Sequence, residues 1–336
     1  MHEALYYDSK GDGTIQCTLC PRNCNIGVDK LGFCGVRKNV DGKLVSLVYG
    51  RVAGDLAVDP IEKKPLFHFL PGSSVLSFGT VGCNLHCKHC QNWNTSQVQA
   101  GQFFEKDFSP EEIVKAAKDR GCDSIAYTYN EPTVFFEYML ETAKLAKEAG
   151  LKNIMVSNGF INEKPLKEIC QYLDSVNIDL KGFTNPFYGR ITGGWLEPVL
   201  DTLKFLKKEK IWFEITNLVI PTLNDDPELV KKMCSWIKDE LGIDIPLHLT
   251  AFHPDFELGN VPPTPVATLL NAYEIAKGVG LKFVFVGNIM ARGYENTLCP
   301  ECDALLIERL GFNVLKIDIV NGKCKSCGCK IPGVFK

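Results

Sequence analysis

The chain has 336 residues, of which 45% are hydrophobic and 23% charged, so it can bury a large core. This length allows two domains, or one α/β barrel with small appendages. With 37 Lys and Arg against 40 Asp and Glu, the net charge of -3 gives no electrostatic case for nucleic acid or membrane as a partner.

The number and grouping of the cysteines indicate metal binding or catalysis rather than disulfide bonds. The start Met1-His2-Glu3-Ala4 has no signal-peptide pattern, and no apolar run reaches the roughly 20 residues of a membrane span, so we expect a soluble, cytoplasmic protein. In a reducing cytosol, clustered cysteines are metal ligands or catalytic groups more often than disulfides. Of 15 cysteines, only Cys122, Cys170 and Cys234 stand outside three clusters, and we expect these three to be packed or free thiols.

The first cluster lies in residues 1–41, which are rich in Gly and Cys and lack periodicity. Its spacing, Cys17-x2-Cys20-x3-Cys24-x9-Cys34, supplies four thiolates and predicts a small N-terminal metal-binding module. Zinc and a second iron–sulfur cluster both fit, with a slight preference for zinc. Residues 42–73 are expected to form short lead-in strands.

From residue 74 to 288, short β-rich segments alternate with amphipathic helical segments. Ser109-Pro110 and Asp226-Pro227 are typical helix starts, and Gly150 and Gly280 lie where helices should end. The candidate strands are 74–80, 124–130, 152–158, 175–181, 211–220, 246–252 and 282–288. Several are apolar throughout, as parallel strands covered on both faces are. Six or seven βα units predict a parallel sheet, either open and doubly wound or a full or partial barrel, with functional groups at the carboxyl ends of the strands.

The second cluster, Cys83-x3-Cys87-x2-Cys90, follows the first of these strands on a Gly-rich loop. Three close thiolates suit soft metals and iron–sulfur clusters. A structural zinc would need a fourth ligand, which His86 or His89 could supply. Three cysteines without a fourth suggest instead a [4Fe–4S] cluster with one iron open to a ligand.

This spacing is that of the radical S-adenosylmethionine (SAM) superfamily, and residues 82–92 resemble the cluster loop of the pyruvate formate-lyase activating enzyme group. The chain is still more similar to the radical SAM component of the AmmeMemoRadiSam system, over nearly its whole length. The resemblance implies an α/β fold, a partial (β/α)6 TIM-like barrel over 74–288, whose [4Fe–4S] cluster is held by Cys83, Cys87 and Cys90. His89 replaces the usual aromatic residue that contacts the adenine of SAM, and a flat imidazole can also stack.

The resemblance also implies a set of SAM contacts at the strand ends. Tyr129-Asn130 replaces a Gly-Gly pair, and Glu131 would accept from the SAM ammonium. Ser157 and Asn158 would face the ribose or the methionine carboxylate.

Further contacts are expected on the later strands. Lys181 would pair with the SAM carboxylate, and Asp179 would bind the ribose or orient Lys181, unless the two form only a structural ion pair. Asn217 and His253 match further SAM-contact positions, although a lone His is usually structural.

The third cluster lies in residues 289–336. Two knuckles, Cys299-x2-Cys302 and Cys324-x2-Cys327, flank a hairpin turn at Asn321-Gly322 and predict a structural zinc in a zinc-ribbon-like module. Cys329 is surplus and could compete as fourth ligand.

The resemblance implies an enzyme that cleaves SAM reductively to methionine and a 5′-deoxyadenosyl radical, which abstracts hydrogen from a protein, peptide or small molecule. It implies a flavodoxin- or ferredoxin-like electron donor, and system proteins of the Memo and AMMECR types as partners. A glycyl-radical enzyme activase is the narrower alternative. Outside the enzymes, a zinc-ribbon binding protein and a multi-cluster electron carrier remain open.

Overall fold

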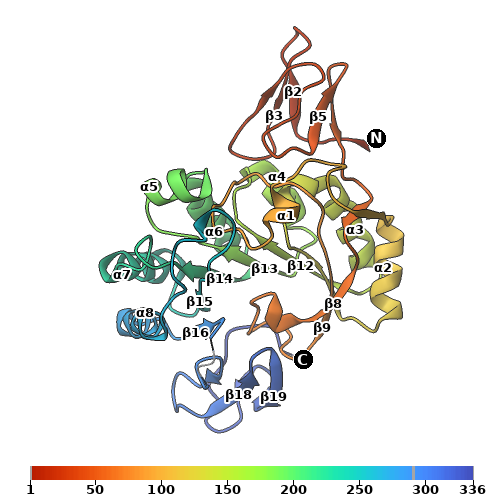
Figure 1. Ribbon diagram of the computed structural model, residues 1–336. Coiled ribbons are helices and arrows are strands. Elements are labelled where there is room, and N and C mark those ends of the chain that lie inside the picture. The colour runs from red at the N-terminus through yellow and green to blue at the C-terminus, as the bar shows by residue number, and fades with distance from the viewer. Residues whose placement is uncertain (1, 290–291, 336) are drawn as a thin grey trace.

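A sheet of eight strands forms the centre of the computed structural model, which describes residues 2–289 and 292–335 (Figure 1). Residue 1 of the predicted N-terminal module and residues 290, 291 and 336 of the predicted C-terminal module lie outside the described residues. The strands are β8 (Ala57–Pro60), β9 (Ser74–Phe78), β11 (Ser124–Tyr127), β12 (Lys152–Ser157), β13 (Ser175–Asp179), β14 (Trp212–Val219), β15 (Leu247–Ala251) and β16 (Val284–Gly287).

The strand order decides between the two sheet architectures that the sequence left open. From β9 to β16 every strand pairs in parallel with the next strand of this sheet along the chain, so the order never reverses. A doubly wound sheet requires such a reversal, and its absence defines a singly wound barrel. Strand β8 adds to β9 in antiparallel fashion, and in the described structure β8 and β16 are the two unpaired edges. The predicted partial barrel is therefore confirmed.

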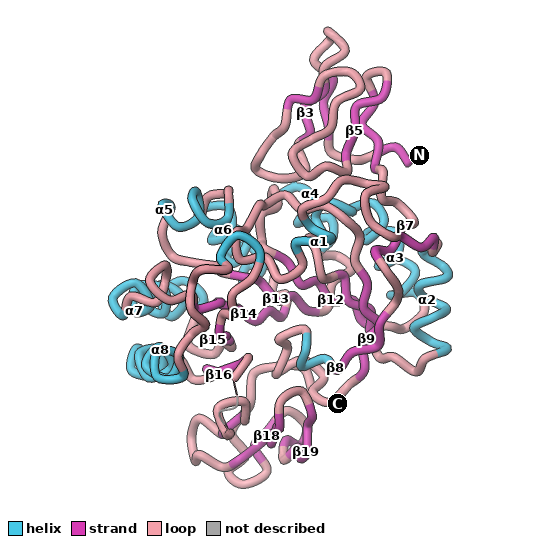
Figure 2. The backbone as a smooth tube through the Cα atoms, in the orientation of Figure 1, coloured by secondary structure: helices cyan, strands magenta, loops and turns pink. Residues whose placement is uncertain are grey.

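Helices cover the outside of the curved sheet (Figure 2). The principal ones are α2 (Pro110–Asp119), α3 (Phe136–Glu148), α4 (Glu163–Ile169), α6 (Glu197–Lys208), α7 (Pro227–Trp236) and α8 (Val266–Val279). Short turns of helix are α1 (Trp93–Ser96), α5 (Asn185–Phe187), η1 (Ile61–Lys63), η2 (Pro132–Phe135), η3 (Tyr188–Thr192), η4 (Ile237–Leu241) and η5 (Phe256–Leu258). None of the described helices is long and apolar enough to cross a membrane.

The helix signals of the sequence act as expected. The Ser109 side chain accepts from the Glu112 amide while Glu112 accepts from the Ser109 amide, which completes a capping box. Asp226 caps α7 by accepting from two amides of its first turn. Gly280, with φ of 105°, ends α8 in a conformation that favours glycine.

The N-terminal module consists of two small antiparallel sheets, β1-β6-β5 and β2-β3-β4, which stand above the barrel in Figure 1. Its strands are β1 (His2–Glu3), β2 (Tyr7–Ser9), β3 (Ile15–Cys17), β4 (Asn25–Ile26), β5 (Arg37–Val40) and β6 (Lys43–Ser46). The predicted boundary after residue 41 falls inside the β5–β6 hairpin, so β6 belongs with this module. Within the predicted lead-in segment, β7 (Arg51–Ala53) pairs with β10 (Glu105–Asp107).

A buried ion pair joins this module to the barrel. Arg37 on β5 donates to both carboxylate oxygens of Glu137 on α3, each at 3.0 Å, and to the Leu5 carbonyl at 2.6 Å. Both charged side chains are almost completely buried. Removal of one partner therefore leaves a charge without compensation.

We expect Glu137→Leu to lower the free energy of unfolding by about 3–5 kcal/mol, because it leaves the Arg37 charge buried and unpaired. The double variant Arg37→Met/Glu137→Leu should recover most of this loss, since no charge remains. Urea unfolding of the three proteins checks this. A double variant as unstable as the single one would contradict it.

The C-terminal module packs against the open side of the barrel. Its strands are β17 (Thr297–Leu298), β18 (Leu305–Leu310), β19 (Asn313–Ile317), β20 (Ile319–Val320) and β21 (Lys323–Cys324). Phe67 and Phe285 of the barrel share an apolar cluster with Leu306 and Ile307 of the module. Between them His68 donates from Nδ1 to the Pro332 carbonyl at 2.8 Å, and burial lowers the pKa of His68 to about 4.

This histidine predicts a pH dependence of stability. The unfolded chain takes up a proton at His68 as the pH falls below 6.5, whereas the folded chain does so only near pH 4. Stability should therefore fall with acidification between these values, by up to about 1.4 kcal/mol per pH unit. Urea unfolding at pH 7 and pH 5 should show a smaller decline for His68→Gln than for the wild type. Equal declines would exclude His68 as the titrating group.

Candidate active site

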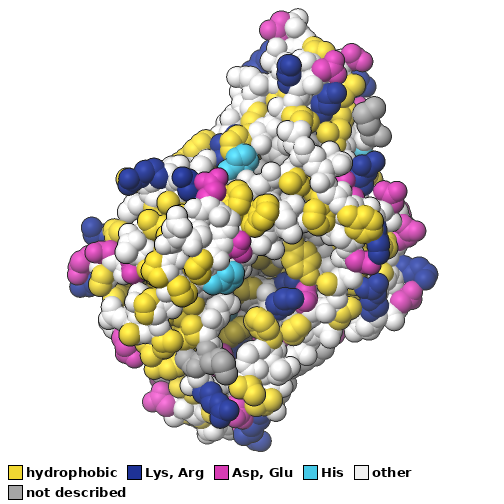
Figure 3. Space-filling view, in the orientation of Figure 1, with side chains coloured by type: hydrophobic (Ala, Val, Ile, Leu, Met, Phe, Trp, Pro, Cys, Tyr) yellow, Lys and Arg dark blue, Asp and Glu magenta, His cyan; other side chains and the backbone are white. Residues whose placement is uncertain are grey.

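The carboxyl ends of the barrel strands surround a cavity of about 590 Å³. Figure 3 shows this face hollowed near its centre. All three cysteines of the central cluster line the cavity, on the loop after β9. Eight of the other predicted residues line it too, from this loop and from the ends of β11, β12 and β13: His89, Tyr129, Asn130, Glu131, Ser157, Asn158, Asp179 and Lys181.

The cysteine loop is held from two sides. Asn130 accepts from the Thr80 amide at 3.1 Å and donates to the carbonyls of Val81 and Gly82 at 3.2 and 2.9 Å. Gly82 has φ of +83°, and a Cβ there would lie 2.5 Å from the Cys34 carbonyl oxygen of the N-terminal module. Asn130 thus positions the loop, and only glycine fits under the module at residue 82.

Cys83 and Cys87 are buried, Cys90 is half-buried, and the three sulfurs do not all lie within 4.8 Å of one another. Burial raises the pKa of Cys83 well above its usual value and that of Cys87 to about 12, so binding of a metal must release protons. Among residues 2–289 and 292–335, only a C-terminal set has three or more candidate ligand atoms all within 4.8 Å of one another. A single zinc ion, bonded at about 2.3 Å, draws its thiolates to about 3.8 Å apart. The wider central set fits a polynuclear iron–sulfur cluster.

His89 lies next to these thiols. Its side chain is 5% exposed, and its Nδ1 has no hydrogen-bond partner in the described part of the chain. Burial lowers the pKa of His89 to about 3, so the ring is neutral. A buried nitrogen without a partner, at the wall of a cavity, is the kind of group that a bound ligand satisfies.

Glu131 is fully buried where β11 ends. Its Oε1 accepts from the Thr133 amide, the Thr133 hydroxyl and the Ser157 hydroxyl, at 2.9, 2.7 and 2.8 Å. Its Oε2 accepts from the Asn158 amide at 2.8 Å. Each carboxylate oxygen has about two acceptor sites, so Oε2 keeps one for a donor in the cavity. Burial raises the pKa of Glu131, and a cationic donor would offset that cost.

Asn158 ties the end of β12 to the cysteine loop. Its Nδ2 donates to Asn84 Oδ1 at 2.9 Å and lies 3.8 Å from the Cys83 sulfur, while its Oδ1 accepts from the Phe160 amide. Ser157, which donates to Glu131, has a similar supporting position. Both residues hold their neighbours at the cavity wall.

Asp179 and Lys181 form an ion pair at the end of β13, with 2.9 Å between Lys181 Nζ and Asp179 Oδ2. Burial opposes the Lys181 charge, but Asp179 and Cys87 outweigh it and raise the pKa of Lys181. The cavity therefore contains a lysine that stays protonated.

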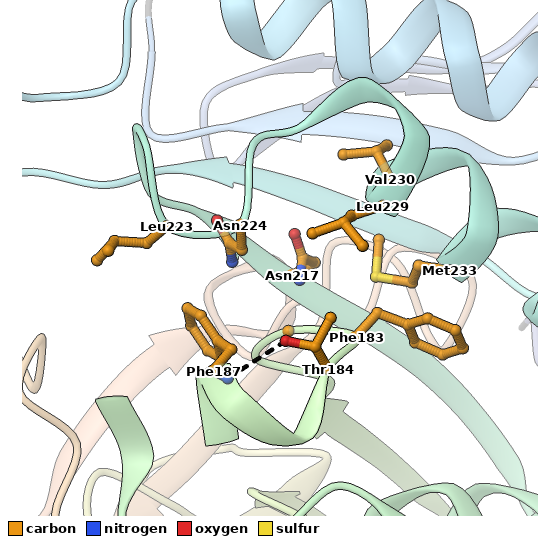
Figure 4. Close-up of a pocket in the computed structure, with 10 residues that line it drawn as sticks. Phe183, Thr184, Phe187, Asn217, Leu223, Asn224, Leu229, Val230 and Met233 are labelled. Carbon is orange, nitrogen blue, oxygen red and sulfur yellow. Dashed lines mark hydrogen bonds between the residues drawn. The ribbon is translucent and has the colours of Figure 1, made fainter. Parts of the chain in front are cut away.

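The remaining two predicted residues lie elsewhere. Asn217 donates to the Leu180 carbonyl at 2.7 Å and lines a separate small cavity, where Figure 4 shows it among Leu229, Val230 and other residues of α7 and nearby loops. His253 is exposed and is not among the described residues that line the large cavity. The geometry brings neither residue to the cysteines.

The structure adds a buried pair that the sequence reasoning missed. His248 on β15 lines the large cavity, and its Nε2 lies 2.6 Å from Oε2 of Glu214 on β14. Burial opposes the Glu214 charge, but the His248 contact outweighs it and lowers the pKa of Glu214. The two-residue alternation of β14 and β15, which places Thr216 and Thr250 at the same cavity, could have identified this inner face.

A second missed group comes from the lead-in segment. Lys64 lines the cavity, and its Nζ lies 2.7 Å from Asp59 Oδ2, which also accepts from the Tyr129 hydroxyl at 2.7 Å. Burial lowers the pKa of Lys64 to about 8. Nothing in the sequence of residues 57–64 signals this role, because the segment reaches the cavity only through the fold.

The C-terminal module contains the compact thiol set. The Cys299 and Cys327 sulfurs are 3.6 Å apart, those of Cys302 and Cys324 are 3.8 Å apart, and all four lie within 4.8 Å of one another. These separations match four thiolates around one tetrahedral ion. The surplus Cys329 is outside the set.

We expect Cys302→Ser to lose one zinc ion per chain relative to the wild type, because it removes a ligand from a closed four-thiolate site. Cys329→Ser is the matched control and should keep its zinc. Elemental analysis of the purified proteins measures both. Loss of zinc from Cys329→Ser but not from Cys302→Ser would reverse the ligand assignment.

A partial parallel barrel with three cysteines on the loop after its first parallel strand defines the class of radical SAM proteins. The profile of the Radical SAM superfamily matches residues 78–233. The uncharacterised protein MJ0808 of Methanocaldococcus jannaschii is 45% identical over 337 residues, which cover all of both chains. The chain belongs to the radical SAM superfamily.

One more distant sequence relative and one solved structure of similar fold were also found. A pyruvate formate-lyase-activating enzyme from Clostridium pasteurianum is 27% identical over 171 residues, 48% of this chain and 69% of that enzyme. The crystal structure of a radical SAM methyltransferase from Sphaerobacter thermophilus has the same barrel fold, with a TM-score of 0.52 at 12% identity over 65% of this chain and 67% of that one.

Proposed function

We propose that the chain is a radical SAM enzyme that uses a [4Fe–4S] cluster, held by Cys83, Cys87 and Cys90, to cleave SAM reductively. The observation that carries the proposal is that these thiols line one large cavity together with Glu131 and Lys181. When bound, the cluster and SAM would supply methionine and a 5′-deoxyadenosyl radical that abstracts hydrogen from the substrate.

The residues of the cavity have distinct parts in this proposal. Glu131 accepts from the ammonium of SAM through the acceptor site left on Oε2. Lys181 attracts the SAM carboxylate, with Asp179 orienting it. His89 offers its flat neutral ring to the adenine, and its free Nδ1 accepts or donates one hydrogen bond according to tautomer.

A substrate would bind in the same cavity, beside SAM. His248 and Lys64 also line this cavity and are polar groups that could contact it. The C-terminal module, which packs on Phe67 and Phe285 of the barrel, would limit the access of water from that side of the cavity and so protect a reactive radical from side reactions.

A glycyl-radical activase is the narrower form of this function. It is supported by the similarity to pyruvate formate-lyase-activating enzymes over about half of this chain. Alternatively, the substrate is a peptide or small molecule. The resemblance to the AmmeMemoRadiSam system points to proteins of the Memo and AMMECR types as partners, and a flavodoxin- or ferredoxin-like protein would supply the electron.

The function is tested by reconstituting the protein anaerobically with iron and sulfide, reducing it, adding SAM and measuring 5′-deoxyadenosine. We expect product from the wild type and none from Cys87→Ala, since three thiolates are needed to leave one iron open. Cys122→Ala, which removes a buried thiol from outside the cavity, is the matched control and should remain active.

A reduced, iron-loaded wild type that forms no 5′-deoxyadenosine would contradict the proposal. Iron without cleavage would then favour an electron carrier. Zinc at all three cysteine clusters would favour a binding protein on a barrel scaffold.

A further inference from the structure

The N-terminal cysteines surround a cavity of their own. Cys17 ends β3, Cys20 and Cys24 lie on the following loop, and Cys34 precedes β5. All four line one small cavity of about 20 Å³ between the module and the barrel. Residues far apart in the module thus place four thiols around one space.

The separation of these four thiols differs from that in the C-terminal module. In the described chain, no three N-terminal sulfurs lie within 4.8 Å of one another, whereas all four C-terminal sulfurs do. A tetrahedral zinc ion holds its thiolates about 3.8 Å apart. A [4Fe–4S] cluster spreads its four cysteines wider, because irons and sulfides lie between them. The C-terminal sulfurs thus have the spacing of a single-ion site, and the N-terminal sulfurs have a wider spacing.

The surroundings suit an anionic cluster. Backbone amides of Leu19, Arg22 and Val36 donate to the sulfurs of Cys17, Cys20 and Cys34. Hydrogen bonds of this kind stabilise cluster thiolates.

The cationic side chain of Arg22 lies between the N-terminal cysteines and the loop that carries Cys83. The Arg22 guanidinium donates to the carbonyls of Asn84 and Gly193 at 2.6 and 2.5 Å and stacks on Phe33 at 3.3 Å from the ring centroid. It also interacts electrostatically with Cys20 and Cys24 on one side and with Cys83 on the other. An arginine in this position offsets negative charge at both sites.

We propose that Cys17, Cys20, Cys24 and Cys34 hold a second [4Fe–4S] cluster beside the loop of the first. All four of its irons have protein thiolate ligands, so it binds no SAM and acts as a one-electron centre. The N-terminal module directly contacts the central cysteine loop, because the ring centroids of Phe33 and His86 lie 4.3 Å apart.

The test uses the full-length chain with Cys83, Cys87 and Cys90 all changed to Ala, purified anaerobically and reconstituted with iron and sulfide. We expect about four irons per chain. Mössbauer spectroscopy should show a [4Fe–4S]²⁺ centre, and reduction should give its EPR signal. No enzymatic activity is needed, so this result is independent of the proposed function.

Adding Cys20→Ala and Cys24→Ala to this variant should abolish the iron signal, whereas adding Cys122→Ala should preserve it. Circular dichroism verifies that each protein is folded. Two zinc ions and no iron in the triple variant would overturn the proposal, and so would iron that persists after the change of Cys20 and Cys24. In an otherwise wild-type chain, Cys20→Ala/Cys24→Ala should halve the iron content.

Discussion

The buried carboxylate of Glu131 is the constraint around which the mouth of the barrel is organised. A carboxyl group with 1% exposure is stable only where hydrogen-bond donors surround it. Its donors come from η2 and from the end of β12, so the carboxylate joins two neighbouring strand ends. Through Asn158, the same network reaches Asn84 on the cysteine loop. The cysteine loop is thus connected, through Asn84 and Asn158, to the hydrogen bonds of this buried carboxyl group.

Buried charges also attach the two outer modules. Arg37 pairs with Glu137 on the N-terminal side, and Arg309 of the C-terminal module lies 3.6 Å from Glu62 with both side chains fully buried. Such pairs add little net stability compared with apolar contacts, but they tolerate little displacement. Each module is therefore held in one position at the edge of the barrel.

An open barrel makes these modules necessary. Because β8 and β16 do not meet, the cavity would be open to water along that side, and residues 61–70 together with the C-terminal module cover it. The N-terminal module approaches the cysteine loop so closely that only glycine fits at residue 82. In both places the modules complete the walls around the cavity.

The sequence by itself determined the elements and the ligand types. Alternating strand and helix patterns predicted the seven parallel strands within a few residues, because burial of a strand on both faces leaves a local apolar pattern. Cysteine spacing predicted three thiol groups, of which the central one lies on a single loop while the two outer ones bring together separate segments of their modules. The strand-end positions of Glu131, Ser157, Asp179 and Lys181 were also predictable, because carboxyl ends of parallel strands meet at one edge.

Only the tertiary structure decided which side chains reach the cavity and how far apart the thiols lie. It showed that Asn130 holds a loop, that Asn217 faces α7, and that His253 is exposed while His248 lies at the cavity. It also distinguished the compact C-terminal thiols from the wider N-terminal ones. These outcomes depend on distances between residues remote in the chain, and such distances are fixed by packing in three dimensions rather than by local spacing.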